Sequence, residues 1–425
     1  MIGRPSLSES ADGVAEAARV LAAGWPGARF LPVLRRANVH GAIDMGLAPG
    51  MLPGRVTLED AREWFSAESA WGAVPEAAGL DCRGILEAAA AGEISTLVLV
   101  GADPLADFPD RDLAQRALDG AGFVISVDTF LNESAARADI VLPAAGFAER
   151  GGTTTNCEGR ISRLAQKMVP PGVAWADWMI ASEIAALLGS DLGFENFEGV
   201  WEEIERLAPS HRGLTAAVLG APSAVDGVVV PMAAVGVALA GIGDRAGAGR
   251  GRSPIDPIAT PGIESVESQG APIRSGASQP AGGDADDTDE RAGMPPRPPL
   301  VRVARPSAAA AVPQLDKYSL RLVSRRQLYD AGTLVQACGS LAPLVRTTGL
   351  AANPADLDRL GVGTGDRVRV RSRRTDVVIE VVADHSMPPG VVSLGFNLAR
   401  DESGVNAAAL IDASMAVVDV RLETI

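Results

Sequence analysis

Short apolar runs alternate with helix-like stretches in the first half of the chain. The runs at 96–100, 123–127 and 140–142 have the length and continuous apolar character of buried strands. Between them, 111–121 and about 132–138 are patterned as helices. This alternation predicts right-handed crossovers and a parallel sheet, and therefore an α/β fold.

The carboxy-terminal part of the chain has a two-residue period instead. Apolar and polar side chains alternate through Tyr318, Leu320 and Leu322, and again around Val368 and Val420. Two further apolar runs lie at 377–382 and 391–394. At least five short strands are thus expected, which is typical of a small β-barrel.

One short helix is expected between these strands. Asn353 is a good N-cap, and Pro354 suits the first helical turn because its missing N–H would have no partner there. Leu357 and Leu360 form an apolar face, and Gly361 is placed to end the helix.

A change in composition separates the two patterns. Residues 244–312 are dominated by Gly, Pro, Ser, Ala and Asp and lack periodic apolar positions, so they cannot bury enough surface to offset the entropy of ordering. We predict an α/β domain at 1–243, a disordered linker at 244–312 and a barrel domain at 313–425. The acidic run at 284–290 is either solvated linker charge or a docking site for a basic partner.

Both ends of the first domain carry further patterns. Ser6 and Glu9 fit a capping box, which predicts a helix with Val14, Ala18 and Leu21 on one face. The strand that would feed this helix is very short, so the chain is expected to begin in the middle of a fold. The uncharged stretch 227–243 contains Pro231 and several glycines and is too short to span a bilayer, so we expect a buried strand and helix there.

Charge and cysteine content exclude several classes of function. Thirty-eight basic and fifty-three acidic residues give a net charge of −15, which disfavours binding to nucleic acid phosphates. Cys82, Cys157 and Cys338 are too few and too far apart for a disulfide framework or a four-thiolate metal site. The three histidines add no metal-binding cluster. We interpret the cysteines as buried and inert.

No known pairing of nucleophile and base occurs, so no catalytic residue and no metal ligand is assigned. Polar side chains are instead dense between Asp128 and Arg160. The tips 101–104 and 128–132 follow predicted strands, at the sheet edge where ligands of parallel sheets bind. Such residues can hydrogen-bond a phosphate-bearing cofactor or can fasten a long loop to its own domain. Composition leaves both interpretations open.

A family resemblance rests on these residues. The run Asp128-Thr-Phe-Leu-Asn-Glu-Ser-Ala-Ala-Arg-Ala-Asp-Ile-Val-Leu-Pro143, followed by Glu149-Arg-Gly-Gly-Thr153 and Asn156-Cys-Glu-Gly-Arg160, resembles the signature of the molybdopterin oxidoreductase family. The resemblance implies a Rossmann-like parallel-sheet domain followed by a double-psi β-barrel of the molybdopterin dinucleotide-binding type. The positions that match its cofactor-contact pattern are Gly101, Asp103, Asp128, Asn156, Glu158 and Arg160.

Within that family, the chain resembles the carboxy-terminal half of the G subunits of bacterial NADH:quinone oxidoreductase, respiratory complex I. The stretches that carry this likeness are 3–7, 35–38 and 41–46. The resemblance implies a scaffold in the hydrophilic arm, with other arm subunits as partners and with NADH and quinone reached through the complex. It implies a peripheral position on the cytoplasmic side of the plasma membrane without a membrane span. Iron–sulfur clusters are expected in an amino-terminal half that this sequence lacks.

Two other functions stay open at this point. The chain could be part of a molybdopterin-dependent enzyme of the formate dehydrogenase or nitrate reductase type that binds a molybdopterin guanine dinucleotide. It could also be a plain nucleotide-binding module, although no GxGxxG follows a strand. Whether a molybdopterin is bound is therefore left undecided.

Overall fold

The computed structural model describes residues 6–230 and 312–425, with short gaps. The gaps are residues 26–27, 29, 32, 35, 60–61, 63–64, 66–73, 346–348 and 399–405. The predicted linker lies outside the described residues apart from Val312, and so does the expected helix beyond residue 230. The domain boundaries at 243 and 313 therefore stay a prediction.

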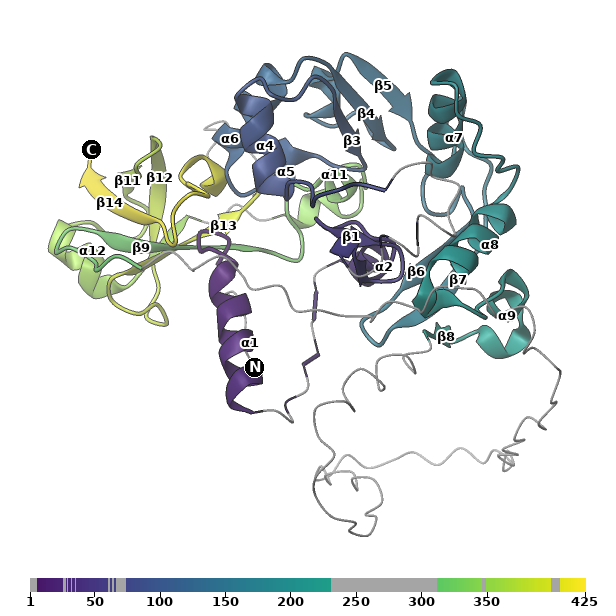
Figure 1. Ribbon diagram of the computed structural model, residues 1–425. Coiled ribbons are helices and arrows are strands. Elements are labelled where there is room, and N and C mark those ends of the chain that lie inside the picture. The colour runs from purple at the N-terminus through teal and green to yellow at the C-terminus, as the bar shows by residue number, and fades with distance from the viewer. Residues whose placement is uncertain are drawn as a thin grey trace, which may run out of the picture.

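A three-stranded parallel sheet forms the centre of the α/β domain (Figure 1). Its order is β3 (Leu97–Val100), β4 (Val124–Asp128) and β5 (Ile140–Pro143). The three predicted strands are confirmed. The predicted helix at about 132–138 is a single 3₁₀ turn, η1 (Ala135–Arg137), because the Asn132 Oδ1 atom accepts the Ala135 N–H at 2.8 Å and starts the turn late.

Helices lie on both faces of this sheet (Figure 1). On one face are α4 (Cys82–Ala90), α5 (Pro104–Asp107) and α6 (Arg111–Gly120), of which α5 and α6 contribute Leu105, Ala114 and Leu118 to a core with Leu97, Leu99 and Val124. On the other face, α7 (Asp177–Leu187) places Ile180 against Val127 and Ala144. Packing against these helices accounts for the buried apolar residues of β3 and β4, whereas Val98 and Val100 of β3 are 50% and 59% exposed.

An antiparallel sheet and two helices complete this region. The strand order is β6 (Gly152–Thr155), β7 (Arg160–Leu164) and β8 (Val228–Val229). Packed on it are α8 (Phe197–Leu207) and α9 (Ala216–Gly220), with the 3₁₀ turns η2 (Pro209–His211) and η3 (Pro222–Ala224). The strand expected after Gly227 is confirmed as β8, but it is not the buried strand we expected, because Val229 is 45% exposed; Val230 beyond it is buried.

The amino-terminal elements are α1 (Asp12–Gly24), α2 (Val39–Asp44) and the short antiparallel strands β1 (Met51–Leu52) and β2 (Val56–Thr57). The predicted capping box is wrong, because the helix begins at Asp12 and not after Ser6. The Ser6 hydroxyl accepts the N–H of Ser324 at 2.8 Å, and the Leu7 N–H donates to the Ser324 carbonyl at 2.7 Å. This segment therefore joins the barrel.

The carboxy-terminal region is a closed barrel of six strands in the order β10-β12-β11-β14-β9-β13. The strands are β9 (Leu320–Arg326), β10 (Leu350–Ala352), β11 (Arg367–Arg371), β12 (Asp376–Ala383), β13 (Val391–Phe396) and β14 (Asp419–Thr424). Two pairs are parallel, β10 with β12 and β9 with β13. The predicted barrel is confirmed, and it has one strand more than the five strand patterns found in the sequence.

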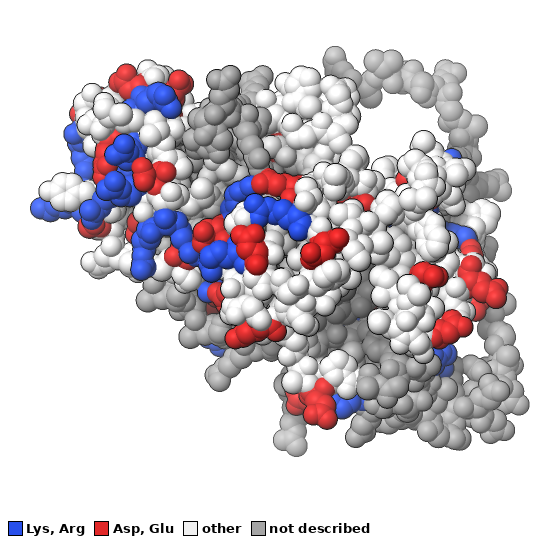
Figure 2. Space-filling model, turned by 90° about the horizontal axis from the view of Figure 1, so that it is seen from above, with Lys and Arg blue, Asp and Glu red and all other residues white. Residues whose placement is uncertain are grey.

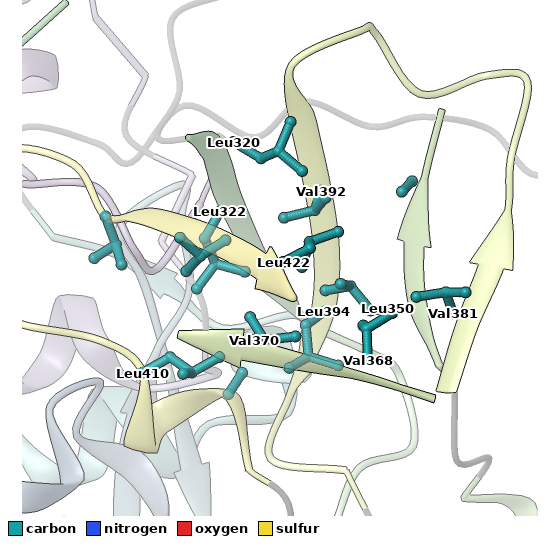
Figure 3. Close-up of a cluster of buried hydrophobic side chains, with 14 of the residues drawn as sticks. Leu320, Leu322, Leu350, Val368, Val370, Val381, Val392, Leu394, Leu410 and Leu422 are labelled. Atoms are coloured by element: carbon teal, nitrogen blue, oxygen red, sulfur yellow. The ribbon is translucent and has the colours of Figure 1, made fainter. Parts of the chain in front are cut away.

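Alternating side chains of these strands fill the barrel. Figure 3 shows Leu322, Val370, Val392 and Leu422 pointing into a shared apolar interior. The predicted helix is confirmed as α12 (Pro354–Leu360), with an Asn353 cap and with Gly361 at φ +71°. Shorter turns are α11 (Thr333–Gln336), η6 (Ala342–Leu344) and η7 (Ala407–Ala409).

The cysteines do not lie where we expected. Cys82 and Cys157 are exposed and Cys338 is partly exposed, so the interpretation as buried residues is wrong. Cys82 is the first residue of α4, and Cys157 lies at the tip of the β6–β7 hairpin, where little can cover a side chain.

Among the described residues, no helix has the length and apolar character that crossing a membrane requires.

Candidate functional site

The loops that follow β3 and β4 are joined by a buried hydrogen-bond network. Asp103 is 8% exposed, and the Ser134 hydroxyl donates to its Oδ1 atom at 2.6 Å. The same hydroxyl oxygen accepts the Leu105 N–H at 3.1 Å. Ser134 thus ties the carboxyl ends of the two strands to each other. The predicted site residue Asp103 is engaged inside this network.

The Asp128 carboxylate also has hydrogen-bond partners, and these lie within its own loop. Its Oδ1 atom accepts the Phe130 N–H at 3.2 Å and its Oδ2 atom accepts the Asn132 side-chain amide at 2.9 Å. Gly101 follows β3 with φ +58°, and its N–H donates to the Val127 carbonyl at 2.8 Å. No atom lies within 4 Å of where a Cβ of Gly101 would be, so this glycine serves the backbone conformation and not a close approach.

The other three predicted positions lie at the tip of the β6–β7 hairpin. The Asn156 Oδ1 atom accepts the N–H groups of Glu158 and Arg160 at 2.9 and 3.0 Å. The Arg160 guanidinium donates to the Glu158 carboxylate at 3.0 Å and to the Gly227 carbonyl at 3.4 Å. The structure therefore gathers Gly101, Asp103 and Asp128 at one sheet edge and places the remaining three on the other sheet.

These six positions can be tested as a binding site for a molybdopterin dinucleotide. Such a ligand needs hydrogen-bonding groups that can turn toward it, and a group already held by the protein must share or give up that bond. In the described residues, the side chains of all five non-glycine positions already have hydrogen-bond partners within the protein. Asp103, Asp128 and Asn156 are therefore engaged within the protein, whereas Glu158 and Arg160 form an exposed ion pair that costs little to open. Their assignment as cofactor contacts stays a prediction.

Sequence reasoning missed two aspartates that bind the barrel. Asp107 of α5 pairs with Arg326 at 2.6 Å and with Arg36 at 3.0 Å. Asp110 is fully buried and pairs with Arg374 at 2.6 Å, while its Oδ2 atom also accepts the Ala413 N–H at 3.1 Å. A cavity of about 300 Å³ lies beside this second contact, lined by Glu87, Ala90, Ala91, Asp110, Leu113, Arg116, Arg374 and Ser414. No local pattern could have revealed pairs that lie over 200 residues apart.

The charges on the surface do not form a large field of one sign on the face that Figure 2 shows. Lys and Arg atoms lie side by side with Asp and Glu atoms on the barrel side of this view. Ion pairs such as Arg321 with Asp419 at 2.9 Å and Arg421 with Asp316 at 2.9 Å illustrate the same mixing. This face offers no continuous basic surface of the kind that grips nucleic acid phosphates.

A second buried polar cluster surrounds His211. His211 is 1% exposed. Its Nδ1 atom is hydrogen-bonded to the Ser210 hydroxyl at 2.9 Å, and its ring packs edge-on against Trp201, with the ring centroids 5.9 Å apart. Burial lowers the pKa of His211 below its ordinary value; Asp44 opposes this shift and Arg55 adds to it. His211 is therefore held in its neutral form.

This histidine predicts a pH-dependent stability. The unfolded chain takes up the proton near pH 6.5, whereas the folded chain takes it up only at lower pH. Stability should therefore be complete above about pH 6.5 and fall below it, by up to about 1.4 kcal/mol per pH unit. Melting curves from pH 7.5 to 5 should show this loss in the wild type and a weaker one in His211→Asn. The exposed His385→Asn is the control, and an equal slope in all three chains would refute the assignment.

The network at the strand ends predicts the cost of removing its centre. Ser134→Ala leaves the Asp103 carboxylate and the Leu105 N–H without this partner, so we expect a loss of about 1–3 kcal/mol in the free energy of unfolding. Glu158→Ala, at the exposed hairpin tip, should change it by less than about 0.5 kcal/mol. Urea titration followed by circular dichroism measures both. Equal effects of the two changes would contradict a structural role of Ser134.

Comparison with known families agrees with this architecture. A family model described as molybdopterin oxidoreductase matches residues 36–187, and a model of the molybdopterin dinucleotide binding domain matches residues 320–418. The chain therefore carries a molybdopterin oxidoreductase domain followed by a molybdopterin dinucleotide-binding domain. The parallel sheet falls within the first match, and most of the barrel within the second.

The relatives include G subunits of NADH-quinone oxidoreductases and alpha subunits of formate dehydrogenases. The G 2 subunit of the NADH-quinone oxidoreductase of Rhizobium meliloti is 41% identical over 200 residues, which are 47% of this chain and 23% of the relative. F420-dependent formate dehydrogenase 2 subunit alpha of Methanococcus maripaludis is 28% identical over 387 residues, 89% of this chain and 49% of the relative. Acetylene hydratase from Pelobacter acetylenicus, a solved structure, has a TM-score of 0.46 at 15% identity and covers 80% of this chain and 46% of its own. The matched part of the chain thus spans about a quarter of the length of the G 2 subunit and about half of the length of the formate dehydrogenase subunit.

Proposed function

We propose that this chain is a scaffold in the hydrophilic arm of a bacterial NADH:quinone oxidoreductase. Its own residues hold no redox centre in this proposal. Electrons pass from NADH to quinone through iron–sulfur clusters carried by polypeptide outside this sequence. The other arm subunits are its partners, and the assembly lies on the cytoplasmic face of the plasma membrane.

One observation carries the scaffold role. The side chains that match the family's cofactor-contact pattern are used in hydrogen bonds within the protein, from Asp103 with Ser134 of the neighbouring loop to Asn156 with the hairpin backbone. Such networks fix loops in place and cost free energy to open, because each freed polar group must find another partner. The 41% identity to a G subunit over nearly half of the chain supports the choice of complex.

Complementation of a gene deletion tests this proposal. Membranes from the deletion strain should lose NADH-dependent quinone reduction, and the wild-type chain should restore it. Trp201→Ala, which removes a buried side chain, should fail to restore it, whereas Trp175→Ala, at a residue 44% exposed, should succeed. Unchanged NADH-dependent quinone reduction in the deletion strain would refute the proposed complex.

A second function is supported by the length of one match. The formate dehydrogenase alpha subunit matches 89% of this chain, so its likeness extends over both domains. The alternative is therefore a part of a molybdopterin-dependent formate dehydrogenase. Formate-dependent reduction of a viologen dye by the same membranes distinguishes the two, since only the alternative predicts that the deletion abolishes it.

A further inference from the structure

The cavity of about 300 Å³ lies where helices α4 and α6 meet the barrel region (Figure 1). Its walls come from both domains, since Ala90 and Leu113 belong to these helices whereas Arg374 and Ser414 belong to the barrel region. Small-molecule sites occur preferentially at domain interfaces, and this volume is at the small end of their range. It equals the liquid volume of about ten water molecules, which limits the size of a ligand.

Two arginines on the wall of this cavity converge on one carboxylate oxygen. The Asp112 Oδ2 atom accepts from the Arg116 Nε atom at 3.0 Å and from an Arg374 guanidinium nitrogen at 3.3 Å. The Asp112 side chain is 51% exposed, and exposed ion pairs of this kind contribute little to stability. The carboxylate of a ligand can therefore replace that of Asp112 between the two guanidiniums at low cost.

Arg374 stays in position without Asp112. Its Nη2 atom donates to Asp110 at 2.6 Å and to Asp412 at 3.3 Å, and Asp110 is fully buried. Among the described residues, the buried Nε–H of Arg374 has no hydrogen-bond partner, so this guanidinium keeps a donor that its aspartates do not use. Arg374 is thus oriented in advance for an added carboxylate.

The charges around the cavity favour a ligand without net charge. Of the charged residues that line it, Glu87 and Asp110 balance Arg116 and Arg374. A chain of phosphates would meet like charge here, which costs free energy. Glu87 is half exposed and pairs with Arg83 at 2.8 Å within one helix, so its carboxylate can accept a second cation cheaply. The cavity therefore offers groups of both signs to one small molecule.

We propose that this cavity binds a small amino-carboxylate in its zwitterionic form. The ligand carboxylate bridges Arg116 and Arg374 in place of Asp112. Its ammonium group pairs with Glu87, and its carbon chain lies on the apolar wall at Leu113. Because both domains form the wall, the bound ligand stabilises the contact between them. The proposal goes beyond the scaffold function and does not depend on which complex the chain enters.

Calorimetric titration of the full chain tests the class of ligand. The probes are β-alanine, γ-aminobutyrate and ε-aminocaproate, which carry both charges at different separations. Butyrate, butylamine and inorganic phosphate are the controls, and each lacks one of the two signs. At least one zwitterion should bind about tenfold or more tightly than every control, because it makes both charge-assisted contacts. A smaller preference, or no binding of any zwitterion up to about 10 mM, would overturn the proposal.

Variants at half-exposed positions test whether the cavity is the binding site. Arg116→Gln should weaken binding of the zwitterion about tenfold or more, and Glu87→Gln should remove its advantage over butyrate. Asp112→Asn should instead strengthen binding, because it removes the competing charge. Arg421→Gln, which breaks an exposed ion pair outside the cavity, is the control and should bind as the wild type does.

Thermal melting without ligand establishes that each variant is folded before it is titrated. In folded chains, unchanged binding by Arg116→Gln, weaker binding by Asp112→Asn, or an equal loss in the Arg421→Gln control would overturn the proposal.

Discussion

Replacing Asp110 with alanine is expected to lower the free energy of unfolding by about 3–5 kcal/mol, the usual cost of breaking a buried ion pair from one side. Asp110 is fully buried, and its Oδ1 atom accepts the Leu113 N–H at 3.0 Å and so caps α6. Its Oδ2 atom receives Arg374 and the Ala413 N–H from the barrel region. One side chain therefore stabilises a helix and holds the two domains together.

A matched control separates burial from charge at this contact. Asp112 also pairs with Arg374, at 3.3 Å, but its side chain is about half exposed, so Asp112→Ala should cost less than about 1 kcal/mol. Denaturant titration of each variant, and of the double variant with Arg374→Ala, measures the coupling between the partners. A loss below about 1 kcal/mol for Asp110→Ala would contradict its role in joining the domains.

Replacing Trp201 with alanine should cost a similar amount, about 3–5 kcal/mol. Trp201 of α8 is 2% exposed and packs against Ile161 of β7 and Leu214, and its indole N–H donates to the Leu214 carbonyl at 2.5 Å. The change leaves a cavity and an unpaired carbonyl beneath the β6–β7 hairpin. That hairpin carries Asn156, so the hairpin should also become less ordered.

Two further variants show which part of the tryptophan matters. Trp201→Phe keeps most of the volume and loses the hydrogen bond, so it should cost less than Trp201→Ala. Trp175→Ala, at a residue 44% exposed, should cost well under half as much. Thermal unfolding followed by circular dichroism ranks the three. Equal losses for Trp175→Ala and Trp201→Ala would show that α8 does not support this hairpin.

Much of the fold follows from local pattern. Continuous apolar runs mark β3 and β4, where Leu97, Leu99 and Val124 pack on helices on one face and Val127 packs on α7 on the other. Alternation marks β9 and β11 because one face of each fills the barrel while the other meets water. Asn353 and Gly361 mark the two ends of α12 through the backbone geometry that each prefers.

The features that were predicted wrongly or missed depend on contacts between residues far apart in the sequence, which local spacing does not reveal. Ser6 fits a capping box locally, yet its hydroxyl pairs with the backbone of Ser324, 318 residues away. The cysteines resemble small core residues in composition, but their positions at a helix start and a hairpin tip expose Cys82 and Cys157. Arg374 and Arg326 find their aspartates only after the barrel meets the α/β domain.

The location of the candidate site could be predicted from the sequence, but the role of its residues could not. Strand order puts Gly101, Asp103 and Asp128 at one edge, as expected for parallel strands. Whether a carboxylate at that edge faces a ligand or its own loop depends on the Ser134 hydroxyl, which is 31 residues from Asp103. The sequence pattern of a cofactor contact and that of a loop-fastening network are the same here.

The scaffold proposal is tested most directly by the metal and pterin content of the chain. The full chain is purified anaerobically from a host that makes molybdopterin cofactors, analysed for molybdenum, tungsten and iron, and acid-oxidised to reveal pterin fluorescence. We predict that each metal, and the pterin, lies well below one per chain. One equivalent of molybdenum or tungsten together with pterin would contradict the proposal and would favour the formate dehydrogenase type of function.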